Sequence, residues 1–155
     1  MDYQDDVDAL NKKKIDSQLE KTQIIRILPE LYLVLNRIEL CREKTNEFIC
    51  DDLIFFNETS VSKIALEKWQ SLTDAFKDFA KLLRALVSSR IFTIQKERKG
   101  LLIEFIIKKI ESIIAEKPQN KYEAFNIAQK LKEILNDTKI YISKIVGTYT
   151  YLIDK

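Results

Sequence analysis

The chain has 155 residues, 46% of them hydrophobic and 32% charged, with a net charge of +2. It contains two glycines, two prolines and no histidine, which argues against folds rich in tight turns and excludes histidine-based catalysis and imidazole metal sites. The length and the apolar share fit one domain over residues 1–155 with a single core. Because so few residues favour turns, we expect this domain to have an all-α fold.

The first helical pattern covers about residues 3–28. Its apolar residues are sparse at the start, and Ser17 with Glu20 matches a capping box, in which two side chains satisfy backbone amides at a helix N-terminus. Residues 1–16 are therefore predicted to be a frayed or separate lead-in.

Pro29 marks the next predicted boundary. A proline followed by an acidic residue is typical of the first turn of a helix, so the pattern predicts either a restart or a kink there. The second helix is expected to run to about Phe56. The segment 57–60 then combines an asparagine suited to a helix C-terminus with a serine suited to an N-cap, which predicts a turn.

A sustained apolar stripe with spacings of three and four predicts a helix from residue 61 to about Lys99. Gly100 directly follows a basic run, a pattern typical of a helix C-terminus, so we expect a break or a kink at this glycine. Residues 101–117 are apolar around most of a helical circumference and predict a buried helix.

Pro118 is expected to end that helix. Asn120 and Glu123 form a second capping signature, after which the last helix runs to the end of the chain. Long helices joined by connections of a few residues predict an elongated up-and-down bundle of four to five helices.

The two cysteines and the absence of targeting signals point to a reducing compartment. Cys41 and Cys50 are nine residues apart, which places them on opposite faces of one helix and prevents them from pairing with each other. We expect reduced structural cysteines, with an intermolecular disulfide or a reactive thiol as alternatives. The N-terminus is acidic and no stretch reaches the roughly 20 apolar residues of a spanning helix, so the sequence predicts a cytoplasmic protein.

Acidic residues gather on the second predicted helix. Glu39, Glu43 and Glu47 are spaced four apart and share one face. Ferritin-like bundles use such glutamates with histidines that this chain lacks, so we expect a solvated charged face, with an acidic contact for a basic partner as the alternative. Asp51 and Asp52 close to the helix end imply either an earlier end or neighbouring cations. No catalytic residue, metal ligand, cofactor or small-molecule substrate is predicted.

The two halves of the chain carry opposite charge. Residues 1–80 hold 11 basic and 16 acidic side chains, whereas residues 81–155 hold 15 and 8. Pairing of acidic early helices with basic later ones would explain this without a partner. The alternative is a basic patch that contacts nucleic-acid phosphates, with Tyr141, Tyr149 and Tyr151 as stacking groups. This candidate patch consists of Arg90, Lys96, Arg98, Lys99, Lys108 and Lys109.

Surplus apolar residues predict a protein contact. Two apolar runs and the helix 101–114 offer more apolar area than a thin bundle can bury easily. The candidate contact residues are Leu53, Ile54, Phe55, Phe56, Tyr149, Tyr151, Leu152 and Ile153.

The sequence thus predicts a noncatalytic interaction protein, such as an adaptor, a regulatory protein or an assembly subunit, that contacts another protein or its own copies. Nucleic-acid binding through the basic half is the alternative. Membrane attachment is disfavoured because the last helix lacks a dense basic face.

Overall fold

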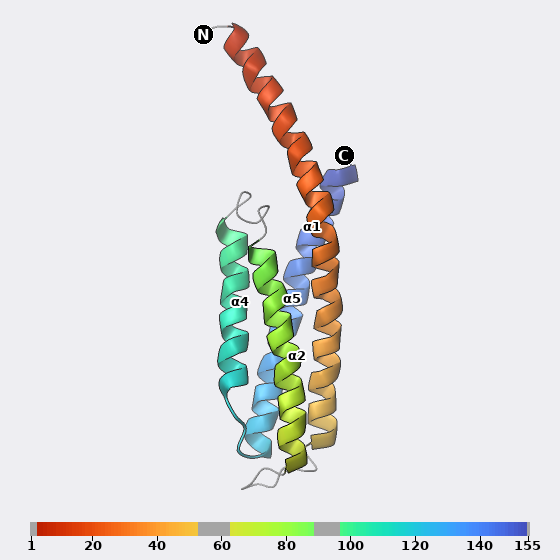
Figure 1. Cartoon of the computed structure of the whole chain (residues 1–155), viewed down its shortest axis with the longest axis vertical. Helices are drawn as coiled ribbons and strands as arrows, with labels where there is room; N and C mark the ends of the chain where they lie inside the picture. Colours follow the sequence, from red (N-terminus) through yellow and green to blue (C-terminus); the bar gives the residue numbers. More distant parts are fainter. Residues whose placement is uncertain (1–2, 53–62, 89–96, 155) are drawn as a thin grey trace.

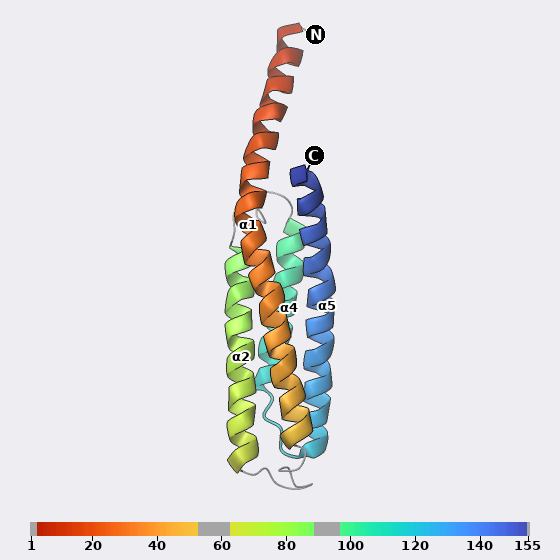
Figure 2. The same cartoon turned by 90° about the vertical axis from the view of Figure 1, so that its right-hand side faces the viewer.

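The computed structural model describes residues 3–52, 63–88 and 97–154. It contains four helices in these ranges, α1 (Tyr3–Asp52), α2 (Lys63–Val87), α4 (Glu97–Ala115) and α5 (Lys121–Asp154). Successive helices run in opposite directions and lie side by side in an elongated bundle (Figures 1 and 2). The predicted all-α, up-and-down architecture is confirmed.

Heptad spacing of the buried residues explains why these helices pack as a bundle. In α1, α2 and α5 the deepest positions alternate by three and four residues, which keeps one seam of each helix facing the others. In α1 this inner seam is Ile24, Ile27, Leu31, Val34, Ile38, Cys41, Thr45 and Phe48. Each helix contacts two neighbours, since α1 packs on α2 and α5, and α4 packs on the same two helices.

Threonines occupy three buried positions in this apolar interior. The hydroxyl of Thr45 donates to the Cys41 carbonyl at 2.7 Å, and that of Thr138 donates to the Ile134 carbonyl at 2.6 Å. Thr73 makes the equivalent bond to Gln70 at 2.9 Å. Because each hydroxyl bonds to its own helix, these residues are satisfied without a partner across the core.

Helix α1 differs from the prediction. It is one continuous helix from Tyr3 to Asp52 with Pro29 inside it, so the restart at Pro29 is wrong and the alternative of a kink remains. The lead-in over residues 1–16 stays a prediction, and the predicted end at about Phe56 lies outside the described residues. The ribbon changes direction within α1, and its N-terminal part projects beyond the other helices (Figure 1), as the steric effect of a proline on the preceding turn would produce. The capping signature at Ser17 falls within a helix that has already begun.

The extent of α1 also tests one of the two explanations for Asp51 and Asp52, namely that the helix ends before them. The helix does not end before this pair, and its last turn contains no basic residue. The earlier helix end is therefore wrong, and the alternative of neighbouring cations stays a prediction.

The predicted helix from residue 61 to about Lys99 is also wrong at its end. Helix α2 stops at Val87, where the Ser88 amide donates to the Arg84 carbonyl at 3.0 Å. Gly100 lies in the first turn of α4 and closes no helix. The apolar stripe in the sequence also stops at Val87, and this pattern marks the end of α2. The turn expected at residues 57–60 lies outside the described residues.

The connection between α4 and α5 matches the prediction. The Glu123 amide donates to Asn120 Oδ1 at 3.0 Å, and Glu123 Oε2 accepts from the Gln119 amide at 2.7 Å. These bonds satisfy amides that the helix itself leaves free. Pro118 is buried, so the connection covers the core beyond the point where α4 has already ended (Figure 1).

Candidate functional site

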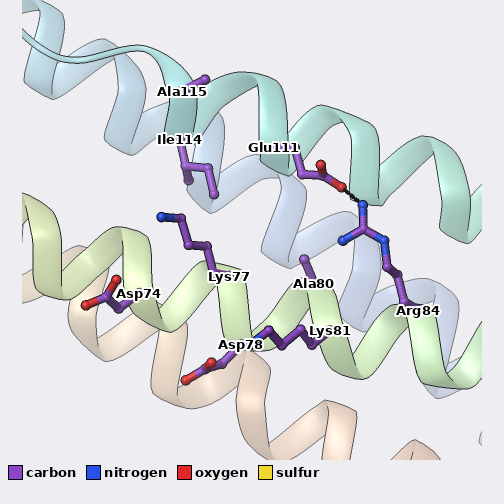
Figure 3. Close-up of a pocket in the computed structure, with 9 residues that line it drawn as sticks. All are labelled: Asp74, Lys77, Asp78, Ala80, Lys81, Arg84, Glu111, Ile114 and Ala115. Atoms are coloured by element: carbon purple, nitrogen blue, oxygen red, sulfur yellow. Dashed lines mark hydrogen bonds and ion pairs between the residues drawn. The ribbon is translucent and has the colours of Figure 1, made fainter.

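A hollow lies between α2 and α4 and forms a groove along these two helices (Figure 3). It has a volume of about 770 Å³ and is crossed by an ion pair between Arg84 of α2 and Glu111 of α4. The side chain of Lys77 extends toward Ile114, while Asp74 and Asp78 lie on the side of α2 away from α4 (Figure 3). Lys81 and three small or branched apolar residues complete the lining: Ala80, Ile114 and Ala115.

A second hollow of about 470 Å³ continues the groove past Arg84 toward Glu104 and Lys108. Acidic and basic side chains therefore both line each part of the groove. Neither hollow brings two carboxylates together without a lysine or an arginine in the same lining, which is unlike the acid–base pairs of hydrolytic sites. Within the described ranges no group of three metal-binding side chains is found.

The predicted acidic row on α1 is exposed, as a solvated charged face should be. Glu39 accepts hydrogen bonds from Lys139 of α5 at 2.9 Å and from Arg42 at 3.4 Å. The hydrogen bond from Lys139, assisted by the charges of Arg42 and Lys139, lowers the pKa of Glu39. Glu47 pairs with Lys44 at 3.8 Å. Two members of the row thus meet cations of their own chain.

These contacts bear on the charge asymmetry between the halves. The Glu39–Lys139 pair joins the acidic half to the basic half, as predicted. The ion pairs Arg84–Glu111 and Lys130–Glu116 instead lie within the basic half. The asymmetry is therefore only partly used in holding the helices together.

The structure describes two side chains of the predicted basic patch. Lys108 and Lys109 are both exposed on α4, but Lys108 lines the groove, whereas the ammonium of Lys109 lies 5.4 Å from the centre of the Phe105 ring. Arg98 and Lys99 belong to the first turn of α4. Arg90 and Lys96 lie outside the described residues, so the patch as a whole stays a prediction.

The predicted apolar contact is corrected at Tyr149, which is only 1% exposed. It belongs to the heptad series of α5 with Leu135 and Ile142 and is therefore a core residue. Tyr151 is 62% exposed, and Leu152 and Ile153 are partly buried against the core. The run 53–56 lies outside the described residues. Of the three tyrosines considered for stacking, Tyr141 is half-buried, and burial raises its pKa.

Cys41 behaves as the structural cysteine that was predicted. It is buried, its thiol lies 3.6 Å from the Ala75 carbonyl, and burial raises its pKa to about 12. A thiol with so high a pKa carries almost no thiolate near neutral pH and is a poor nucleophile.

Sequence reasoning missed an apolar stripe on the outside of α1. Four large apolar residues, which we call the outer stripe, are 38 to 57% exposed and face away from the bundle. They are Ile25, Tyr32, Leu33 and Leu40. The signal was present in the sequence as a second set of seven-residue spacings beside the inner seam. It was hidden because the whole segment is apolar enough to be taken for one broad face.

Comparisons with known proteins assign no family. No family model matches the chain, and no solved structure matches it significantly. A stretch of 75 residues is 25% identical to the probable ATP-dependent DNA helicase HFM1 of Mus musculus, which covers 47% of this chain and 5% of the mouse protein. The chain thus spans a small fraction of that relative. Across the described ranges no helix is both long and apolar enough to cross a membrane.

Proposed function

We propose that this chain is a noncatalytic interaction module whose helical bundle presents the outer face of α1 to another protein surface. The observation that carries this proposal is that α1 has two apolar faces. Its inner seam is buried by α2 and α5, whereas the outer stripe has 38 to 57% of each side chain in contact with solvent. An apolar stripe on a helix is the usual recognition surface for a second helix.

The length of α1 supports the same proposal. Its N-terminal part projects beyond α2, α4 and α5 (Figures 1 and 2). A helix without packing neighbours is marginal in water, because most helical stability in proteins comes from the burial of one face. Adaptors and assembly subunits use helices of this kind to reach a partner, and we propose that the partner of this chain is cytoplasmic.

Affinity capture from the native host tests the proposal. The wild-type chain is compared with Leu33→Asp, which places a charge in the outer stripe, and with the matched control Leu102→Asp on α4, since Leu102 is exposed to a similar degree. We expect proteins, including added copies of the chain, to be retained by the wild type and by the control and lost with Leu33→Asp. Equal recovery with all three baits would contradict the proposal.

Nucleic-acid binding through the basic half is the second candidate. It is supported by the exposure of Lys108 and Lys109 on α4 and by the partial similarity to a protein named as a DNA helicase. Nuclease treatment during the same capture separates the two candidates. Recovery that disappears with nuclease, and that is reduced by Lys108→Glu but unchanged by Leu33→Asp, would favour this second function.

A further inference from the structure

The outer stripe has a spacing that reads the same in both directions along the helix. Its four residues are separated by seven, one and seven positions, and they extend over about 22 Å at 1.5 Å per residue. A two-fold symmetric interface requires a surface that is complementary to itself, so that each residue meets its counterpart from the opposite end. The stripe satisfies this requirement about a centre between Tyr32 and Leu33.

We propose that the outer stripe of α1 is a self-association surface on which a second copy of this chain binds through its own α1, antiparallel and two-fold symmetric. Ile25 of each copy then lies opposite Leu40 of the other. Next to the symmetry axis, Tyr32 lies beside Tyr32 of the second copy, and Leu33 lies beside Leu33 of the second copy. This inference rests on the proposed function and names its partner.

Charge complementarity supports the second copy as the occupant. About the same centre, Lys21 of one copy lies within one residue, about 1.5 Å, of the level of Glu43 of the other, on the same flank of the stripe. Within one chain the two residues are 22 positions apart, or about 33 Å along the helix axis. An attraction between them therefore exists only between copies.

The surface of α5 beside the stripe leaves room for another helix. The contacts of Glu39 with Lys139 and of Arg42 with Asn136 fix the antiparallel register of α1 and α5. Continued for seven residues, about two turns, this register places Tyr32 level with Val146, next to Gly147. Gly147 is exposed, and a Cβ atom built there would meet nothing within 4 Å. The glycine thus leaves open the flank on which the two Tyr32 side chains would meet.

The area is consistent with a weak dimer. The exposed parts of the four side chains amount to roughly 400 Å² per copy. Together with the flanking residues of both copies, the total buried area approaches the lower limit of stable interfaces, which is about 1,200 Å². We therefore expect a monomer–dimer equilibrium that depends on concentration over the micromolar range.

Light scattering over a concentration series is the first experiment. The wild type and the control Leu102→Asp should shift from monomer to dimer, whereas Leu33→Asp should weaken association at least tenfold. A strictly monomeric wild type up to the highest concentration would overturn the self-association while leaving the proposed function intact, because a different protein could still occupy the stripe.

Cysteine cross-linking tests the antiparallel geometry. In a Cys50→Ser background, single variants Ile25→Cys and Leu40→Cys are oxidised separately and as a mixture. The buried thiol of Cys41 serves as an internal control that should not react. Cross-linking that is strong only in the mixture supports the proposal. Efficient cross-linking of each variant alone would indicate a parallel pair and overturn it.

A charge exchange completes the test. Lys21→Glu and Glu43→Lys should each weaken dimerisation several-fold, and the double variant should restore it. Since the two residues cannot meet within one chain, recovery in the double variant reports only on contacts between copies. Dimerisation that ignores all three variants would contradict the proposed register.

Discussion

The two faces of α1 have similar chemistry and different surroundings. The inner seam repeats by alternating three and four residues, which matches the packing of antiparallel helices, and its members are almost fully buried. The outer stripe repeats by seven and one, and it stays in solvent with residues as large as tyrosine. The comparison teaches that the amount of apolar sequence in a helix does not determine which face is core. The register shared with the neighbouring helices does.

Truncation on the two faces should give the largest contrast. Leu31→Ala removes a fully buried side chain of the inner seam and should lower the free energy of unfolding by about 2 to 5 kcal/mol, because it leaves a cavity. Leu33→Ala, two residues along, should change it by less than about 0.5 kcal/mol in dilute solution. Urea unfolding followed by circular dichroism measures both. Equal losses would show that the outer stripe is part of the core.

Thiol labelling sharpens the contrast at adjacent positions. Cys41 is 1% exposed with a pKa raised to about 12, whereas Leu40 is 38% exposed. In a Cys50→Ser background at pH 8, we expect Leu40→Cys to react with a thiol reagent at least about a hundredfold faster than Cys41. Comparable rates would indicate that α1 is rotated or locally open.

Thr45 tests how strictly apolar the inner seam must be. Its buried hydroxyl bonds only to the Cys41 carbonyl of the same helix among the contacts described. Thr45→Val should therefore leave the fold intact and raise the free energy of unfolding by up to about 1 kcal/mol, as measured by urea unfolding. A large loss of stability would mean that the hydroxyl has a further role in the core.

The smallest expected effect is a pH dependence at the edge between the faces. The pKa of Glu39 is lowered in the folded state, mainly by the hydrogen bond from Lys139, so this carboxylate stabilises the fold at pH values above its ordinary pKa of 4.5. That contribution is lost as the pH falls through the lowered value. Because the pair is exposed, it should be less than about 0.5 kcal/mol.

Comparison of the wild type with Lys139→Gln measures this contribution. Urea unfolding between pH 3 and 7 should show a difference at pH 7 that vanishes at the acid end. The titration of Glu39, followed by NMR, should move toward its ordinary pKa in the variant. A difference in stability that persists unchanged at pH 3 would assign the effect to packing of the lysine stem.

Much of the fold could be predicted because helical spacing and few punctuating residues leave little choice. The all-α bundle and the cap at Asn120 follow from local patterns. The prediction of a buried helix over 101–117 was wrong, because α4 buries only one face and leaves Leu102 51% and Phe105 59% exposed. The break at Gly100 and the restart at Pro29 were wrong although each motif is locally valid, because the helix continues through both positions. A capping motif contributes about 1 kcal/mol to stability, which is less than the burial of a few apolar side chains contributes.

The candidate site was harder to predict than the fold. Tyr149 and the outer stripe are both apolar, and only the register against α5 and α2 decides that the first is core and the second is surface. The groove between α2 and α4 depends on the distance between two helices, which the sequence of neither helix contains. The exposed state of Lys108 and Lys109, in contrast, follows directly from their positions on an amphipathic helix.

The order in which neighbouring helices contact one another around the bundle bears on the folding rate. Three of the four helix pairs join helices that follow one another along the described chain, so they can form early and at little cost in loop entropy. Only the pairing of α1 with α5 joins the two ends, and it closes the ring with Glu39, Arg42 and their partners on α5. Docking of these terminal helices is therefore the step expected to limit the folding rate, and substitutions along their shared seam should slow refolding more than substitutions between α2 and α4.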